Sequence, residues 1–593
     1  MNLQKNNISK IPLNLIITVL FLSFILFYPT FKFALAGGED WLTLYRYIKT
    51  FDSFTSHFDL GNYIGNYDAG NIFMGIIYRM FGFNPLPYYI ASLIFRIFAS
   101  LTLYLAVLRW TEDKFAAWIA SVIFIAGFAG IQATEYSFNM TTYASLGFFN
   151  IFMYLFAQSR ENLPTREILK EVFLLFVAFY IAPHRLHGLI ITIPFVEFLR
   201  IKKKSVNNLF SAFLRIVLLL APIFVFRIST ALSLDEYSLN MLREVLHKHI
   251  SIFFYPISIM GSTFFPDRIV SYLLDTAIPL SGKSFLEFLK FFFPILLSFL
   301  IMSYLLFRKN VNQKYILVCL TAFYFAFCLL LFFCLNQPDS PNLQNPITVA
   351  ETLIGSFALT LMTSFFILNA RKHKKLVQAG LFGLTSAILL NTIPWLARYT
   401  ATFPSDHRYL VMPSASFLVA FSCFLAILII QKRHIFAFLI FIFILLVNIF
   451  SIRGYFNYHS ANGRNSKEVD KYFDQIRSVL PEKLNDGLVV FLFTSDDAPM
   501  TLYHAITFGF SNHLVLIDQR FAGYDSTKVL AVDNKKSLLE IYKDPNSHEF
   551  YRYGMPYSKI SVENIYSFEL KNKNLIDNTW SLRDELLKVS RDF

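Results

Sequence analysis

The sequence predicts an α-helical polytopic membrane protein that carries a small α/β domain at its C-terminal end. The chain of 593 residues is 55% hydrophobic and only 16% charged, which is less charge than a soluble protein of this length carries. Apolar runs of about 20 residues, each long enough to cross a hydrocarbon core of roughly 30 Å as a helix, recur as far as residue 452. Beyond residue 460, short apolar runs alternate with polar segments, a pattern typical of an α/β fold.

Basic clusters predict the orientation of about thirteen transmembrane helices. Lys and Arg gather before the first span and in every second loop after it, and by the positive-inside rule these loops lie in the cytoplasm. The odd number of spans then puts the C-terminal end outside. We therefore expect an integral plasma-membrane protein with a transmembrane domain at residues 1–452 and an extracytoplasmic domain at residues 453–593. The expected spans are residues 11–33, 86–108, 115–132, 142–158, 170–183, 186–200, 211–231, 290–307, 315–335, 349–369, 376–394, 409–430 and 434–452.

Two long external loops, 34–85 and 232–289, contain further helical patterns. Residues 71–83 have apolar side chains at helical spacing, and residues 239–250 combine such spacing with several cations. Each pattern predicts a helix that lies on the membrane interface.

The pattern of residues 453–593 predicts a small domain without a catalytic site. We expect helices at residues 466–480, 500–509 and 535–542, and buried strands at residues 488–494, 513–518 and 528–532. It has no glycine-rich phosphate loop and no nucleophile elbow. All four Cys fall within apolar spans, so no disulfide is expected to stabilise the parts outside the membrane.

An acidic break, Gly37-Gly38-Glu39-Asp40-Trp41, follows the first span directly. Adjacent carboxylates at the edge of a membrane are costly unless they stay hydrated, bind a cation or do chemistry. One interpretation is that they stabilise the N-terminal end of a helix that starts near Trp41. The other is that one of them is a general base or a ligand of a divalent cation, with a pKa raised by desolvation. The residues alone leave both interpretations open.

The order of motifs along the chain adds a resemblance. The acidic pair is followed by the interfacial helix that ends in Arg79-Met80-Phe81-Gly82-Phe83-Asn84 and by the span over residues 88–105. Glu135 precedes the span over residues 138–156, and a late loop reads Asp406-His407-Arg408-Tyr409-Leu410-Val411-Met412-Pro413. In this order and sidedness the sequence resembles the GT-C class of membrane glycosyltransferases, which includes the protein O-mannosyltransferases and the lipid A aminoarabinose transferases.

The resemblance implies transfer of a sugar from a polyprenyl-phosphate donor to a lipid, glycan or protein acceptor on the extracytoplasmic face, usually with inversion. It implies that Asp40 is the catalytic base with Glu39 as its neighbour, and that Glu135 helps to hold the acceptor or a divalent cation. The class often has two Asp at this place. The Glu-Asp pair of this chain therefore leaves open which acid is the base.

A lipid-phosphate donor requires cations at the outer interface. The candidates are Arg408, Arg185, His184 and Arg398, and the alternative for each is that it reaches out to lipid headgroups. Arg96 lies in the middle of a span, where we expect it to pair with an acid or a backbone carbonyl.

Two other functions fit the same composition. A lipid-linked oligosaccharide flippase or polysaccharide-export protein would place its essential charges along a path across the membrane instead of gathering them at the outer surface. The sequence has no pair of Gly/Pro-interrupted spans typical of a carrier. The third candidate is a scaffold with a sensing tail, in which the acids only cap a helix. The net charge of +13 is expected in a polytopic protein and does not indicate nucleic-acid binding.

Overall fold

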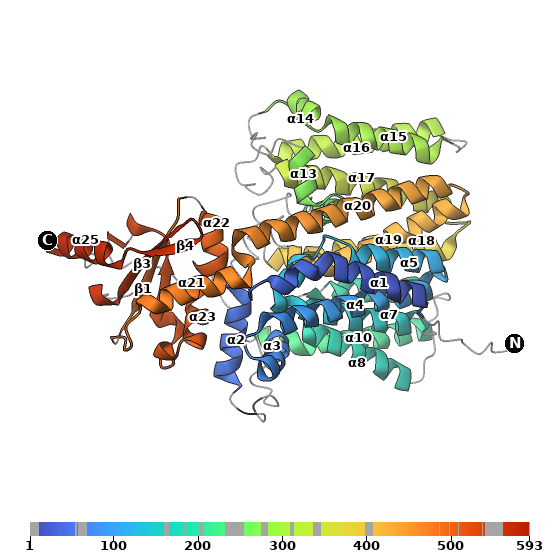
Figure 1. The fold of residues 1–593 in the computed structure, drawn as a ribbon. Coiled ribbons are helices and arrows are strands. Elements are labelled where there is room, and N and C mark those ends of the chain that lie inside the picture. The colour runs from blue at the N-terminus through green and yellow to red at the C-terminus, as the bar shows by residue number, and fades with distance from the viewer. Residues whose placement is uncertain are drawn as a thin grey trace.

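A bundle of long helices is joined at one end to a small α/β unit (Figure 1). We call this α/β unit the C-terminal unit (residues 466–591). The computed structural model describes residues 11–51, 53, 56, 68–158, 165–182, 185–186, 188–200, 206–231, 254–273, 283–308, 313–335, 346–397, 407–485, 487–496, 498–507, 509–536, 538–539 and 561–591.

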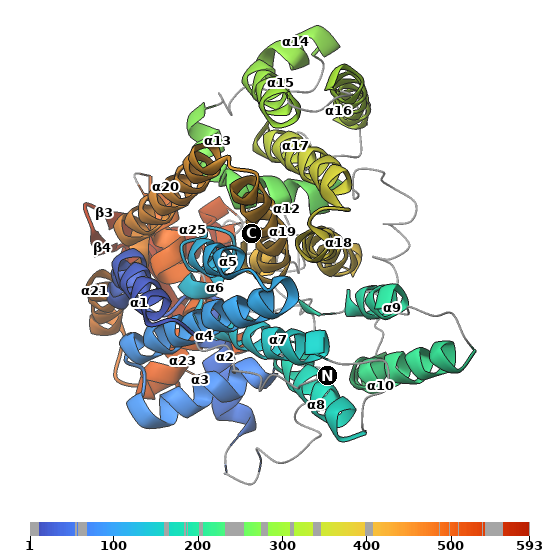
Figure 2. The same cartoon turned by 90° about the vertical axis from the view of Figure 1, so that its right-hand side faces the viewer.

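Long apolar helices form the bundle. Viewed along their axes, α14–α16 lie at one edge and α8–α10 at the opposite edge (Figure 2). The helices are α1 (Leu13–Phe27), α4 (Pro85–Thr111), α5 (Lys114–Ile125), α7 (Met140–Gln158), α8 (Thr165–Ile181), α9 (Leu189–Arg200), α10 (Val206–Ala231), α12 (Tyr255–Phe264), α13 (Asp267–Leu273), α14 (Phe285–Phe291), α15 (Phe293–Phe307), α16 (Gln313–Leu335), α17 (Pro346–Asn369), α18 (Lys374–Ala397), α19 (Val411–Ile430) and α20 (His434–His459).

Short elements at the end of the bundle near the C-terminal unit carry the residues of interest. They are η1 (Tyr28–Lys32), α2 (Glu39–Thr50), α3 (Asp68–Phe81), α6 (Gln132–Glu135), η4 (Ser137–Asn139), η8 (His407–Leu410) and η9 (Ser460–Arg464). We call residues 33–41 the acid loop and residues 126–139 the second loop.

The helices indicate an integral membrane protein, as predicted. Every predicted span overlaps a helix or a helix pair, but the span expected at residues 115–132 is longer than its helix, because α5 ends at Ile125 and the second loop follows. Among the described helices, seven are long and apolar enough to cross a membrane, and an eighth span results if α14 and α15, bent by 69°, are counted together. The number thirteen and the orientation of the two ends stay predictions.

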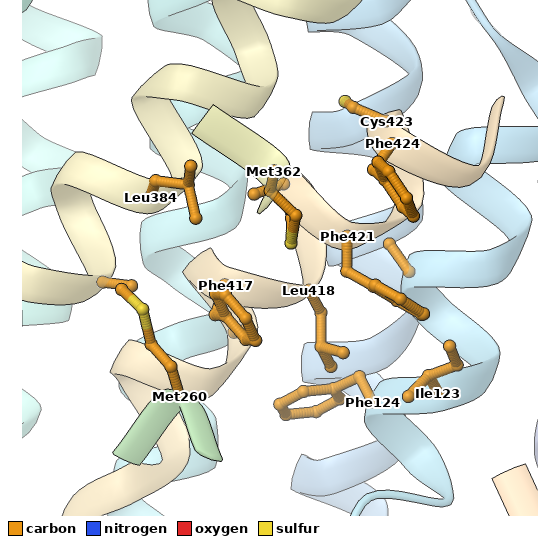
Figure 3. Packing of buried hydrophobic residues seen from close by; sticks show 14 of the residues in the cluster. Ile123, Phe124, Met260, Met362, Leu384, Phe417, Leu418, Phe421, Cys423 and Phe424 are labelled. Carbon is orange, nitrogen blue, oxygen red and sulfur yellow. The ribbon is translucent and has the colours of Figure 1, made fainter. Parts of the chain in front are cut away.

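Helix α19 forms the centre of the apolar core. It is apolar on all sides, and 78% of the segment that is long enough to cross a membrane is buried. This is expected for a helix that is surrounded by other helices. Figure 3 shows Leu418 and Phe421 of α19 directed toward Ile123 and Phe124 of α5. By contrast, α1 exposes Leu13, a position suited to contact with lipid.

The C-terminal unit is built around a four-stranded mixed sheet of order β2-β1-β3-β4. Strand β1 is parallel to β2 and β3, so that Val490 pairs with Leu530 on one side and Ile565 on the other, and β4 is antiparallel to β3. Both faces of β1 are buried beneath helices. The elements are α21 (Ser466–Val479), β1 (Val489–Thr494), α22 (Pro499–Leu502), η10 (Tyr503–Thr507), α23 (Phe510–Ile517), β2 (Val529–Val532), β3 (Ile565–Lys571), β4 (Asn574–Asp577) and α25 (Thr579–Arg591).

Several predictions for the tail are confirmed and one is wrong. Helix α21 and strands β1 and β2 lie where the sequence predicts them, and so does α3, the helix whose place on the membrane interface stays a prediction. The predicted strand at residues 513–518 is instead helix α23, which begins directly after a turn at Gly509 with a φ of +88°. A short apolar run cannot be assigned to strand or helix by periodicity alone. The predicted helix at 239–250 lies outside the described residues. Half of the one at 535–542 also does, and the four residues of it that the structure describes are helical.

Close contact between α12 and α17 gives a test of the bundle. A Cβ atom on Gly261 would lie 1.9 Å from the Glu351 carbonyl oxygen, and small residues allow membrane helices to approach in this way. We expect Gly261→Ala to lower the free energy of unfolding by about 1–3 kcal/mol, because the two backbones must separate. Thermal unfolding in detergent checks this. Gly523→Ala, where no atom lies within 4 Å of the new methyl group, should change little.

Candidate active site

Asp40 joins the acid loop to the second loop. Its side chain is fully buried in the first turn of α2. One carboxylate oxygen accepts hydrogen bonds from the backbone N–H groups of Ala36 (2.9 Å) and Ser137 (3.3 Å). The other accepts from the N–H of Phe138 (2.9 Å). Asp40 thus stabilises the N-terminal end of η4, where an anion is favourable, and its side chain does not cap α2.

Burial raises the pKa of Asp40 to about 6, from an ordinary value of 3.8. The amide hydrogen bonds from Phe138 and Ala36 and the positive charge of Arg464 act in the opposite direction. Desolvation outweighs them because the carboxylate has lost its contact with water. Of the possibilities that the sequence left open, hydration does not apply to Asp40, because its side chain is fully buried. A raised pKa is what the interpretation as a general base or a ligand expects.

The C-terminal unit packs against the acid loop beside Asp40. The ring of Trp41 stacks on that of His513 in α23, with centroids 4.0 Å apart and an angle of 8°. A Cβ atom on Gly509 would lie 1.6 Å from the carbonyl oxygen of Gly37. Only glycine permits so close an approach.

Glu135 lies at the end of α6 and is 1% exposed. The hydroxyl of Tyr455 donates a hydrogen bond to one of its carboxylate oxygens. The other oxygen lies 3.1 Å from Nδ1 of His459 and 3.4 Å from Nε of Arg464. Its charge is therefore compensated by an arginine that is itself only 2% exposed.

Arg464 connects the two loops. It donates hydrogen bonds to the hydroxyl of Tyr89 (3.0 Å) and to the backbone carbonyl of Glu135 (3.2 Å). Tyr89 in turn donates to the carbonyl of Ala34 (2.7 Å), and the N–H of Ala34 donates to the carbonyl of Arg464 (2.8 Å). The structure thus gathers Asp40, Glu135 and Arg464 at one end of the bundle.

Sequence reasoning missed the residues that α20 and η9 contribute. Tyr455 and His459 are four residues apart and so share one face of α20, and Arg464 follows one turn later. These side chains follow directly after an apolar span, which was a usable signal, because polar groups at the edge of a membrane must find partners.

Glu39, the neighbour predicted to assist Asp40, lies in the same turn of α2 and is half-buried. The hydrogen bonds that hold Asp40 come from backbone amides and do not involve it. The two acids therefore occupy different environments. Asp40 has the buried, desolvated position.

The predicted phosphate-binding cations are only partly described. The guanidinium of Arg185 lies over the ring of Tyr409, 4.0 Å from its centroid. Tyr409 belongs to η8, whose backbone includes Arg408, and η8 contacts α6 of the second loop. His184, Arg398 and the side chain of Arg408 lie outside the described residues.

Arg96 has carbonyl and hydroxyl partners, one of the two alternatives expected for it. It is 1% exposed and donates hydrogen bonds to Thr134 (2.9 Å), Tyr143 (2.9 Å) and the carbonyl of Gly127 (2.6 Å). Among the described residues it forms no ion pair. Arg96 therefore holds the second loop in place through Gly127 and through Thr134, the residue before Glu135.

A divalent cation finds no fitting ligand set in the described part of the chain, where no three His, Cys, Asp or Glu side chains are arranged to hold one. A further potential metal ligand close to this site is His504 of η10, whose ring lies 5.3 Å from that of His459. Burial lowers the pKa of His504 to about 4, and the neighbouring His459 contributes. His504 is therefore neutral at ordinary pH.

Comparison with known proteins gives structural similarities only. No protein-family model matches the sequence, and no curated protein matches it. Similar solved structures include ArnT from Cupriavidus metallidurans in the apo state, with a TM-score of 0.31, 11% identity, and coverage of 93% of this chain and 92% of that one. The same protein bound to undecaprenyl phosphate gives a TM-score of 0.30 and 12% identity, covering 94% and 93%.

Another similar structure is the Archaeoglobus fulgidus oligosaccharyltransferase in complex with Zn and sulfate. It has a TM-score of 0.37 and 12% identity, and the match covers 88% of this chain and 62% of that one. ArnT and this oligosaccharyltransferase are GT-C class membrane glycosyltransferases, the class that the sequence resembles. With TM-scores below 0.5, the similarities assign no role to any residue here, and the roles rest on the geometry of the site.

Glu135→Gln should destabilise the protein strongly. Removing the carboxylate charge leaves Arg464 buried without its ionic partner, which costs about 3–5 kcal/mol in comparable buried pairs. Unfolding in detergent measures the loss. Asp584→Asn, which breaks the exposed Lys588–Asp584 pair in α25, is the control and should cost less than about 1 kcal/mol. Equal effects of the two changes would contradict the buried-pair interpretation.

Proposed function

We propose that this protein is a membrane glycosyltransferase that moves a sugar from a polyprenyl-phosphate donor to an extracytoplasmic acceptor, with inversion at the anomeric carbon. The observation that carries the proposal is the burial of Asp40 and Glu135, from two separate loops, around Arg464. Buried ionisable groups in a membrane protein are expensive to maintain and mark functional sites. Asp40, Glu135 and Arg464 lie together at one end of the bundle, which favours chemistry at the surface over a transport path.

The environments of the two acids suggest different roles. Glu135 is neutralised by Arg464 and receives a hydrogen bond from Tyr455, so it suits the orientation of an acceptor. Asp40 is held by backbone amides and has a pKa of about 6. A base works best when its pKa lies near the working pH, so Asp40 is the better candidate for proton transfer.

In the proposed reaction, Asp40 takes the proton from an acceptor hydroxyl or amine while that atom bonds to the anomeric carbon of the sugar. The bond between this carbon and the donor phosphate breaks, and the phosphate leaves with the electron pair. Arg185, beside η8, and Arg408 within it would neutralise the departing phosphate. His184 and Arg398 stay predicted phosphate ligands.

Two features of the site limit this mechanism. The described residues do not fit a divalent cation, so no step is assigned to one. Asp40 is fully buried, and an acceptor can reach it only when a contact of the acid loop opens. Substrate binding must therefore be coupled to a movement of this loop.

A transfer assay with purified protein and a panel of radiolabelled polyprenyl-phosphate sugars tests the proposal. We expect Asp40→Asn to lower kcat by at least about 100-fold, the typical contribution of a general base. Asparagine offers one acceptor oxygen to three amides, so this variant should also lose about 1–3 kcal/mol of stability. Its folded fraction must be measured alongside its activity.

Glu39→Gln is the matched control in the same turn and should keep most of the activity. Full activity of Asp40→Asn, or equal loss in Glu39→Gln, would contradict the assignment of Asp40 as base. No turnover by the wild type with any donor, together with donor-independent movement of lipid in vesicles, would instead indicate the flippase alternative.

The pH dependence of the reaction should show the titration of Asp40. As the pH falls through about 6, kcat/KM should decrease, approaching tenfold per pH unit, because the base becomes protonated. The effect on stability has the opposite sign. A raised carboxyl pKa stabilises the fold when the group is protonated, and this contribution is lost as the pH rises from 3.8 to about 6.

Rates measured between about pH 5 and 8, with thermal unfolding at each pH, therefore separate loss of activity from loss of fold at Asp40. A rate that stays constant over this range would contradict the assignment.

A further inference from the structure

Arg464 stands where the last membrane helix becomes the C-terminal unit. The turn of η9 leaves helical geometry at Asn462 and at Gly463, which has a φ of +89°. A Cβ atom on Gly463 would lie 2.6 Å from the carbonyl oxygen of Thr501 in α22. The next residue, Asn465, forms an antiparallel bridge with Phe33 and caps α21. The backbone of Arg464 is thus fixed between the acid loop and the C-terminal unit.

The side chain of Arg464 touches the element that carries Glu135. Its guanidinium donates to the Glu135 carbonyl at 3.2 Å, and its Nε lies 3.4 Å from the Glu135 carboxylate. The planar guanidinium group of Arg464 therefore holds both the backbone and the side chain of Glu135. Lysine, with a compact charge and no fork of donors, cannot reproduce this arrangement.

Arg464 also reaches the acid loop through Ala34. Tyr89 receives a hydrogen bond from Arg464 and donates one to the Ala34 carbonyl, while the Ala34 N–H donates to the backbone carbonyl of Arg464. Two residues further on, the N–H of Ala36 binds the Asp40 carboxylate. Arg464 is thereby connected to both candidate catalytic acids by short, fully buried contacts.

We propose that Arg464 is a positioning residue that sets the relative placement of Glu135 and of the loop bearing Asp40, and that the C-terminal unit acts on the reaction through it. The inference rests on the proposed function of the two acids. A displacement of about 1 Å at a reacting group can reduce a rate by about 100-fold. The C-terminal unit would therefore influence turnover without supplying a group that touches substrate.

The test compares Arg464→Gln, Arg464→Lys and Arg520→Gln in the full-length protein. Arg520 is a matched control because it forms an ion pair with Asp518 (2.6 Å) and donates to the carbonyls of Leu480 and Arg477 inside the C-terminal unit. We expect Arg464→Gln to lower kcat by about 100-fold with little change in the KM for the donor. Arg464→Lys should recover part of this loss, and Arg520→Gln should affect stability but not kcat.

Hydrogen exchange supplies a readout that does not require turnover. We expect Arg464→Gln to speed exchange of the amides of Ala34 and Ala36, whose hydrogen bonds depend on the placement of the acid loop, and Arg520→Gln to leave them unchanged. Faster exchange in a protein whose wild type transfers no sugar would leave the positioning role standing while the proposed function fails. An unchanged kcat per folded molecule, or equal effects of the two glutamine variants, would overturn the positioning role.

If Arg464→Gln does not fold, Tyr89→Phe carries the test. This change removes the hydroxyl that joins Arg464 to Ala34 and keeps the buried charge pair. It should lower kcat several-fold and speed exchange at Ala34. The absence of both effects, with Arg464→Lys as active as the wild type, would also overturn the inference.

Discussion

The buried contact between Arg464 and Glu135 constrains how the two ends of this chain meet. Neither charge can be left alone in a site closed to water, because the desolvation cost of a buried ion is returned only by its partner and by further hydrogen bonds. Glu135 belongs to the second loop, and Arg464 lies at the end of η9, just before the C-terminal unit. The requirement that they pair therefore places the start of the C-terminal unit beside the second loop. The C-terminal unit then also packs on the acid loop, where Trp41 stacks on His513 next to the buried Asp40.

The same constraint makes the two carboxylates chemically different. Glu135 keeps a charged partner, whereas Asp40 relies on backbone amides and retains a raised pKa. Environments that separate two acids in this way assign them different tasks. The price is stability, since a charged Asp40 opposes folding at neutral pH. Such a cost is expected at a functional site rather than in an ordinary core.

The apolar pattern of the sequence predicted the positions of the bundle helices. The order of loops led, through the resemblance, to Asp40 and Glu135 as candidate site residues. Neither pattern could reveal Arg464. It lies 329 residues after Glu135, and no local spacing connects them. The strand expected at residues 513–518 was wrong for a related reason. His513 and its apolar neighbours form a helix because they pack on Trp41 and on β1, and such contacts are invisible in a short run of residues.

The contacts around the acid loop differ in the cost of breaking them, and this difference indicates where the loop can open. Separating Arg464 from Glu135 would leave two buried charges without partners. Separating Trp41 from His513 would expose only stacked rings, and burial lowers the pKa of His513 to about 3, so that this histidine carries no charge at ordinary pH. The side of the acid loop that faces Arg464 and Glu135 is therefore the fixed side. An acceptor can therefore reach Asp40 more easily by displacing the stacked rings than by separating Arg464 from Glu135. The contact between Arg464 and Glu135 stays closed, next to the glycine turn at Gly463.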